Sequence, residues 1–310
     1  MEIILDLTLP FFAVIGLGIF AVRTNMIDAS AAKIINVFVF NFTMPALVIS
    51  GLARQDFDAL IDGRFLFGWA LAGLLLFAIG GIISRLFFSG KIGEFAVTGQ
   101  ASSIGNNGFL GFPLLAAAFS DEGLRIASTA LLIDLMLIIP ISIAILEASG
   151  GGNARDTFKR VVKGALFNPF IFAIFIGFFL SATGIGLPGP SERFVEFLAG
   201  AAGPAALFAL GISLAKLRFE GDITSIFVIS FLKLILHPLA VFFALTFLEV
   251  DGKSIAIGVV LASLPVAGNV FVIAQQYDVM VRRASSAILI STIAAIATTA
   301  YALSWANVAG

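Results

Sequence analysis

The segment Gly99-Gln-Ala-Ser-Ser-Ile-Gly-Asn-Asn-Gly-Phe-Leu-Gly-Phe-Pro113 decides how this chain folds. It lies within a long apolar stretch, yet it contains four glycines, two asparagines and a proline. Inside a helix each glycine costs about 1 kcal/mol and a proline about 3 kcal/mol relative to alanine. The sequence therefore predicts a helix that is interrupted here. A matching interruption is expected in a later apolar stretch, at Ser263-Leu-Pro-Val-Ala-Gly-Asn269.

The composition around these two interruptions is that of a membrane protein. Of the 310 residues, 60% are hydrophobic and 12% are charged, whereas a soluble domain carries roughly 25% charged residues. A helix needs about 20 apolar residues to cross a bilayer, and continuous apolar runs favour helices over a membrane barrel. We therefore expect an all-α membrane protein with ten transmembrane helices, near residues 5–22, 33–53, 65–88, 94–119, 124–147, 164–183, 192–215, 223–248, 254–276 and 283–304.

The scarcity of reactive side chains excludes several classes of function. The chain has no cysteine and one histidine, which excludes disulfides, thiolate catalysis and zinc sites built on cysteines or on several histidines. Acidic residues are not paired within a span, so we expect no catalytic residues, no enzyme activity, no metal site and no cofactor. The net charge of −1 and the thin spread of basic residues argue against a nucleic-acid partner.

Basic residues are divided unequally between the two sides of the expected spans. Of the 18 Lys and Arg residues, twelve fall on one side, five fall on the other, and Lys233 lies inside the eighth span. The side that is richer in Lys and Arg is normally cytoplasmic. This division places both termini outside the cytoplasm.

The chain divides into two halves, 1–147 and 164–310, joined by a cytoplasmic linker at 148–163 that starts with a Ser-Gly-Gly-Gly run. Residues 125–133 match residues 282–290 at six of nine positions. Each half holds five expected spans, an odd number, so the second half must enter the membrane in the opposite direction. An inverted repeat of this kind is typical of secondary transporters, whose binding site lies near the midplane where the repeats meet.

The two interruptions form the expected binding site. A helix that begins at a break presents unpaired N–H groups and the positive end of its dipole, which favour a carboxylate or a similar anion. Asparagines beside the break add amide donors and acceptors. The alternative is a pair of proline kinks that bind nothing. On the first interpretation, the substrate-binding residues are Asn106, Asn107, Gly108, Gly268 and Asn269, and the helix-breaking residues are Gly105, Pro113 and Pro265.

Three ionisable residues lie inside the expected spans. Asp134 lies near the middle of the fifth span, and Lys233 and His237 lie four residues apart in the eighth. A charge at this depth costs at least about 2.5 kcal/mol, so each side chain is expected to face protein or water. The functional role is ion coupling or charge compensation during transport. The alternatives are a structural charge pair, and a Lys233 side chain that extends toward the membrane interface. For His237, a proton relay competes with a neutral ring that bonds a carbonyl.

Several motifs resemble those of the auxin efflux carrier family, which includes plant auxin carriers and bacterial carriers of malate or malonate. The resemblance covers all ten expected spans. Its sharpest parts are Asn41-Phe-Thr-Met-Pro-Ala-Leu47, Asn106 with Gly111-Phe-Pro-Leu114, and Leu264-Pro265 followed by Phe271-Val-Ile-Ala-Gln-Gln-Tyr277.

This resemblance implies a ten-helix fold similar to those of bile-acid symporters and sodium–proton antiporters. Spans 1, 2, 6 and 7 would form a scaffold, and spans 3–5 and 8–10 would form a transport domain in which broken helices 4 and 9 cross at the site. The crossing positions of the family correspond to Asn106, Pro113 and Pro265. A homodimer through the scaffold and a location in the bacterial inner membrane are also implied.

Together these features predict a secondary active transporter of a small organic anion, a mono- or dicarboxylate, with an elevator-like alternating-access mechanism. Its partners are then that anion and the lipid bilayer, and its coupling ion is Na⁺ or H⁺. The alternative is a membrane sensor or scaffold protein that keeps the carrier fold and moves nothing.

Overall fold

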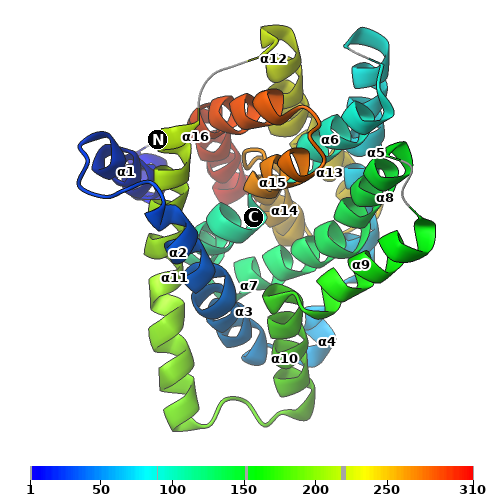
Figure 1. Ribbon diagram of the computed structural model, residues 1–310. Coiled ribbons are helices and arrows are strands. Elements are labelled where there is room, and N and C mark those ends of the chain that lie inside the picture. The colour runs from blue at the N-terminus through cyan, green and yellow to red at the C-terminus, as the bar shows by residue number, and fades with distance from the viewer. Residues whose placement is uncertain (1, 89, 151–152, 218–220, 310) are drawn as a thin grey trace. The chain divides into compact units, whose positions relative to one another are not determined.

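The computed structural model describes residues 2–88, 90–150, 153–217 and 221–309, and it is all-helical as expected (Figure 1). Among these residues no strand forms, and the one extended pairing is an isolated bridge between Gly105 and Val266. In the described residues, six helical stretches are long and apolar enough to cross a membrane. The number rises to seven if the helices at 155–164 and 169–183, which are bent relative to each other, are counted as one span. Ten spans and an inverted repeat stay predictions. The six helical stretches that are long and apolar enough to cross a membrane are 31–53, 63–87, 107–149, 189–215, 223–247 and 281–306.

The interruptions explain why fewer than ten of the described helices are long enough to cross a membrane. Helices α6 (Ile92–Ser103), α14 (Gly252–Ala262) and α15 (Gly268–Gln276) hold 12, 11 and 9 residues, and each is shorter than the ~20 residues of a complete span. In contrast, residues 107–149 form one helical stretch of 43 residues, which is more than one span requires. Within it Ser120 has a non-helical backbone (φ 52°, ψ −137°), so the stretch is kinked there.

The chain forms two compact units, each built from three segments of the sequence. The second boundary between them along the chain, at 107/108, falls within the first interruption, so Asn107 belongs to unit 2 and Gly108 to unit 1. Helix α7 (Phe112–Ile133) contributes to both units. Unit 1 comprises residues 1–62, 108–129 and 166–217, and unit 2 comprises residues 63–107, 130–165 and 218–310.

Unit 1 is a set of apolar helices in which α1 packs along α11 and α3 packs against α10 and α11. Its core includes the buried side chains of Leu52, Ile174 and Ile212. The elements of unit 1 are α1 (Glu2–Arg23), α2 (Ala31–Phe38), the π-helix η1 (Val39–Thr43), α3 (Met44–Ala53), α4 (Phe57–Leu60), most of the π-helix η2 (Asn107–Gly111), the first part of α7, α10 (Pro169–Thr183) and α11 (Gly189–Lys216).

Unit 2 contains the crossing of the two interruptions. Helix α6 packs against α5 and α8, and α14 packs against α13 and α16. Its core includes Phe65, Leu76 and Val260. Besides α6, α14, α15 and the end of α7, its elements are α5 (Gly63–Phe87), the π-helix η3 (Asp134–Ile138), α8 (Ile139–Ser149), α9 (Ala154–Leu166), α12 (Ile223–Phe231), the π-helix η4 (Leu232–Leu236), α13 (His237–Phe247) and α16 (Val281–Ala309).

Each of the four π-helices in the described residues precedes a proline. Two residues after η1, η2, η3 and η4 end, the chain has Pro45, Pro113, Pro140 and Pro238, respectively. A proline ring in a helix clashes with the carbonyl four residues earlier. In all four cases that carbonyl belongs to the middle residue of the π-helix, so the widened turn relieves the clash. In unit 2 these prolines therefore set the positions of two widened turns, η3 and η4.

The linker expected at 148–163 is mostly helical. Residues 148 and 149 are the end of α8, residues 151 and 152 of the glycine run lie outside the described residues, and α9 occupies the linker from Ala154 onward. Helix α9 ends before Asn168, whose side chain caps α10 by accepting from the N–H groups of Phe170 and Ile171. The helix forms because apolar and basic residues recur at helical spacing after the glycines.

Glycines permit the close contact of α1 with α11. A Cβ on Gly18 would collide with the carbonyl oxygen of Phe208 and would lie 3.0 Å from the Cα of Gly211. Backbone atoms cannot move aside as the end of a flexible side chain can. We predict that Gly18→Ala lowers the free energy of unfolding by about 1–3 kcal/mol or more, measured as thermal unfolding of the purified protein in detergent.

Gly16→Ala is the matched control, because Gly16 lies in the same helix and a Cβ there has nothing within 4 Å. It should be neutral, or stabilising by up to about 1 kcal/mol through helix propensity. Equal melting temperatures for the two variants would contradict the packing described for unit 1.

Candidate functional site

The two interruptions expected from the sequence meet inside unit 2. Helices α6 and α14 both end there. The chain is extended directly after α6, at Ile104, whereas after α14 it first makes a turn at Ser263 and is extended by Ala267. The two segments form an antiparallel bridge between Gly105 and Val266. Residues 104–107 and 263–267 are called the crossing from here on.

Hydrogen bonds between the two segments of the crossing satisfy the unwound backbone. The N–H of Asn106 donates to the carbonyl of Pro265 over 2.8 Å, and the N–H of Ala267 donates to the carbonyl of Ile104 over 3.2 Å. An unpaired backbone group in hydrocarbon costs several kcal/mol. Each interruption therefore supplies the partners that the other needs.

Hydroxyl groups of α16 complete this support. The N–H of Val266 donates to Oγ of Ser291 over 3.1 Å, and the Ser291 hydroxyl donates in turn to the carbonyl of Ile288. The hydroxyl of Thr299 donates to the carbonyl of Ser263 over 3.3 Å. The second interruption is thus attached to a continuous helix of the same unit.

One helix begins at the crossing with an open N-terminus. The N-cap residue of α15, Ala267, has no side chain that could bond the first N–H groups of the helix. Gly268 is exposed, although the residues just before it are buried. The side-chain oxygen of Asn269 is buried and has no hydrogen-bond partner among the described residues. An uncapped N-terminus beside an unpaired amide can hold an anion that also carries a polar group.

Asp134 is buried at the crossing and is held by two N–H donors. Its carboxylate accepts from Nδ2 of Asn107 over 2.7 Å and from Nε1 of Trp69, in α5, over 3.2 Å. These bonds connect the first interruption to the widened turn η3, which Asp134 begins. The Oδ1 atom of Asn107 is buried and has no hydrogen-bond partner in the described part of the chain.

Lys233 is fully buried in the other widened turn, η4, and reaches the end of α14. Its Nζ donates to the carbonyl of Ala262 over 2.5 Å and lies 3.1 Å from Nδ1 of His237. The Ala262 carbonyl belongs to the last residue of α14, where the helix dipole favours a positive charge. The His237 ring thus has two neighbours at this turn, the Lys233 amine and the Ala262 carbonyl.

Gly105 leaves room for both polar groups. A Cβ at this position would lie 2.9 Å from Oδ1 of Asn107 and 3.2 Å from Nζ of Lys233. Asp134 and Lys233 also attract each other electrostatically. Five side chains therefore form one polar group packed against the crossing, called the buried cluster below: Trp69, Asn107, Asp134, Lys233 and His237.

Nine of the eleven site residues predicted from the sequence lie in unit 2. The other two, Gly108 in η2 and Pro113 as the second residue of α7, belong to unit 1. Asn107 and Asp134 are brought together, and so are Lys233 and His237. The helical geometry is lost at residues 104–106, well before Pro113. Those found in unit 2 are Gly105, Asn106, Asn107, Asp134, Lys233, His237, Pro265, Gly268 and Asn269.

Three residues of the site were missed. Trp69 is one of two tryptophans in the chain, and an indole N–H in an apolar span needs an acceptor, which is a usable signal. Gln100 is buried in the quoted segment. Its Oε1 accepts from the Ser142 hydroxyl over 2.9 Å, and its Nε2 has no partner among the described residues. Ser291 carries no signal, because serine is common in membrane helices.

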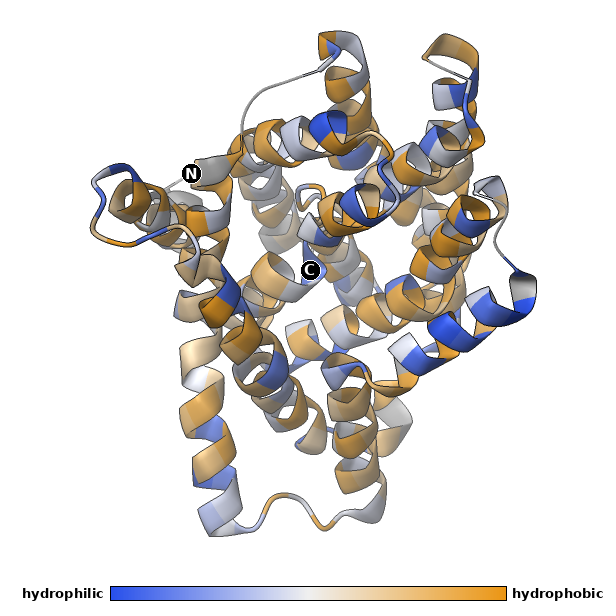
Figure 2. Cartoon of the chain, viewed as in Figure 1, coloured by the Kyte–Doolittle hydropathy of each residue, from blue (hydrophilic) through white to orange (hydrophobic). Residues whose placement is uncertain are grey.

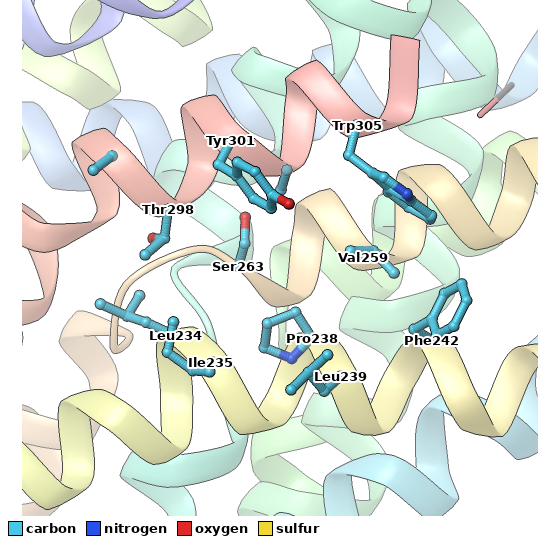
Figure 3. Close-up of a pocket in the computed structure, with 12 residues that line it drawn as sticks. Leu234, Ile235, Pro238, Leu239, Phe242, Val259, Ser263, Thr298, Tyr301 and Trp305 are labelled. Carbon is cyan, nitrogen blue, oxygen red and sulfur yellow. The ribbon is translucent and has the colours of Figure 1, made fainter. Parts of the chain in front are cut away.

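A cavity of about 510 Å³ lies beside the crossing and is apolar (Figure 3). It is bounded by α13, α14 and α16 and touches the crossing at Ser263. None of its lining residues is charged, so it suits an alkyl chain better than an anion. The residues that line it are Leu234, Ile235, Pro238, Leu239, Phe242, Val259, Ser263, Ala297, Thr298, Tyr301, Ala302 and Trp305.

Comparisons with known proteins cover both interruptions. A family model described as membrane transport protein matches residues 3–303. A protein of Rhizobium meliloti (strain 1021), named "Putative malonate transporter", is 31% identical over 96% of this chain and 94% of its own length. The "Uncharacterized transporter YfdV" of Escherichia coli (strain K12) is 26% identical over 94% of this chain and 93% of its own length. The lysosomal cholesterol signaling protein of Mus musculus is 25% identical over 92% of this chain and 35% of its own length.

The buried cluster predicts strong coupling between its two charges. Asp134 and Lys233 attract each other across the cluster, and removing one of two opposite buried charges leaves the other uncompensated, which costs about 3–5 kcal/mol in buried ion pairs. We predict that Asp134→Asn and Lys233→Met each destabilise the protein by an amount of that order. The double variant should be less destabilised than the sum of the single variants. A double-mutant cycle of thermal stabilities in detergent measures this coupling.

The exposed ion pair between Arg64 and Glu249, at 3.9 Å in the same unit, is the matched control. Its cycle, with Arg64→Met and Glu249→Gln, should give a coupling of less than about 1 kcal/mol. Additive effects at Asp134 and Lys233 would mean that the two charges stabilise the crossing independently, against the arrangement described.

Proposed function

Because the chain belongs to the membrane transport protein family, we propose that it is a secondary active transporter that carries a small organic anion by way of the crossing. The membership bears out the resemblance to the auxin efflux carriers, whose members are transporters rather than enzymes. The chain is therefore an integral membrane protein. Its proposed location is the bacterial inner membrane, with both termini outside the cytoplasm.

The observation that carries the proposal is the open N-terminus of α15. The first N–H groups of this helix have no side-chain cap, and they follow Gly268, which is exposed. A carboxylate placed there receives charge-assisted hydrogen bonds and the favourable end of the helix dipole. The Oδ1 atom of Asn269, which has no hydrogen-bond partner among the described residues, adds an acceptor for a protonated group of the substrate. Asn106 and Asn107 lie in the other segment of the crossing, at residues 104–107, and add further polar side chains to the site.

The proposed substrate class is a mono- or dicarboxylate, with malonate as the first candidate. The relative named for malonate is 31% identical over nearly the whole chain. Malonate has two carboxylates, and one can bind at the α15 N-terminus. The buried cluster lies against the same crossing, and within it the charges of Asp134 and Lys233 offset each other. The substrate charge therefore needs compensation from a coupling ion, Na⁺ or H⁺.

The proposed mechanism is elevator-like alternating access, with ten spans arranged as two inverted repeats. Unit 2 contains the whole crossing, including the α15 N-terminus and the buried cluster. A unit that holds its site internally can carry a bound substrate across the membrane without dismantling the site. The proposal also includes a homodimer, in which two copies of the chain contact each other through the scaffold spans 1, 2, 6 and 7.

A sensor that binds a ligand without moving it is the second candidate. One relative is a signaling protein, and it matches 92% of this chain. Purified protein in liposomes separates the two functions. Ligand binding with no flux of radiolabelled malonate or of other small carboxylates would favour the sensor.

We predict that Asn106→Ala and Asn269→Ala each lower malonate uptake into proteoliposomes at least tenfold. The loss of a hydrogen bond to a charged group is worth about 1.5–3 kcal/mol. Gln276→Ala is the matched control, because Gln276 is an exposed amide at the other end of α15 and should leave uptake unchanged. Uptake is measured with and without a Na⁺ gradient and with and without a pH gradient, which identifies the coupling ion.

The variants must first retain the melting temperature of the parent protein within a few degrees. Malonate should stabilise the parent and Gln276→Ala in a thermal-shift assay, and it should stabilise both crossing variants less. Uptake at the parent rate by both crossing variants would exclude the crossing as the substrate site.

A further inference from the structure

Helix α9 has two chemically different sides. At 100° per residue, Phe158, Val161 and Val162 fall on one side, called the apolar face. Arg155, Lys159 and Lys163 recur at every fourth residue beside it, and they are called the basic stripe. Phe158 is 69% exposed and Val162 is 37% exposed, and all three residues of the basic stripe are exposed. Figure 2 shows this helix as a concentration of hydrophilic residues in a chain that is otherwise mostly hydrophobic.

The charge of α9 prevents it from crossing the membrane. Five of its 13 residues are charged, four basic and one acidic. It also ends as a separate helix, because Asn168 caps the next helix, α10. Helix α10 is apolar throughout, and α8 before it is apolar for most of its length. Helix α9 is therefore a charged segment that connects two membrane-embedded segments.

Contacts within unit 2 hold a different side of α9. Arg160 donates to Oε1 of Glu147, at the end of α8, over 2.5 Å, and Tyr277 donates its hydroxyl to the same oxygen over 2.6 Å. Burial, together with the hydrogen bond to Glu147, raises the pKa of Tyr277 to about 12, so the phenol stays a donor at neutral pH. Thr157, on the same side as Arg160, is buried. These contacts fix the rotation of α9 and leave the basic stripe and most of the apolar face exposed, with Val161 partly covered.

We propose that α9 lies flat on the membrane surface, with its apolar face among the lipid acyl chains and its basic stripe on anionic phospholipid headgroups. The two features together match a surface that is apolar at one depth and negative at the next, as at the edge of an anionic bilayer. The apolar face of α9 is small, so the basic stripe supplies much of the attraction between the helix and the membrane. Each basic residue near an anionic surface strengthens binding roughly fivefold. This proposal does not depend on the transported substrate.

The absence of cysteine from the chain makes a direct test possible. A Val162→Cys variant can be labelled at one site with an environment-sensitive fluorophore and placed, as the full-length protein, in nanodiscs. Phosphatidylcholine alone is compared with phosphatidylcholine mixed with phosphatidylglycerol. We expect the label to shift to the blue and to become several-fold less accessible to iodide when phosphatidylglycerol is present. High salt should reverse much of this change.

Neutralising the basic stripe with Arg155→Gln, Lys159→Gln and Lys163→Gln together should abolish the dependence on phosphatidylglycerol. The matched control neutralises Arg64 and Lys253, two exposed basic residues of unit 2, and should leave that dependence intact. Disulfide cross-linking between unlabelled copies of Val162→Cys under oxidising conditions would overturn the proposal in favour of a protein contact. Protection of the label from iodide that is the same in both lipids and unaffected by the triple variant would overturn it in the same way. Free access of iodide in both lipids would also overturn it.

Discussion

Unit 2 depends on one exchange of hydrogen bonds, in which the N–H groups of Asn106 and Ala267 donate to the carbonyls of Pro265 and Ile104. A chain within a membrane cannot leave the helical conformation unless its backbone groups find partners, because water is absent there. Each interruption alone would be costly, and the two together satisfy each other. The open start of α15 and the carbonyl that Lys233 bonds are both consequences of this exchange. The glycines and prolines permit it, but the pairing makes it stable.

The sequence carried the general character of the protein and the positions of the interruptions, because both follow from local chemistry. The low charge content predicted membrane helices, and Gly105 and Pro265 mark residues that are extended in the structure. Pairings across the fold could not be predicted in the same way. Asn107 and Asp134 lie 27 residues apart on different helices, and no pattern connects them. The glycine run near the start of the linker is typical of a flexible connection, whereas the residues that follow it have helical spacing and form α9.

The buried cluster brings a negative and a positive group together with little net charge. A carboxylate and an ammonium that compensate each other inside unit 2 are cheaper in a low dielectric than either alone. This matters for the proposed movement, since a unit that passes through hydrocarbon with an unpaired charge would face a large barrier. The balance also leaves the α15 N-terminus as the main source of positive potential for an anion. The cluster is thus suited to shaping the crossing, whereas the backbone is suited to holding the substrate.

The widened turns before Pro140 and Pro238 have a consequence for comparing related chains. A π-helical turn inserts one residue more than an α-helical turn, so it rotates the preceding part of the helix by about 100° relative to the part that follows. Asp134 and Lys233 each lie within such a turn. In a relative that lacks the downstream proline, an aligned Asp or Lys would face another direction even if its helix had the same length. Equivalence of these charges between relatives should therefore be judged on the charged residue and its proline as a pair.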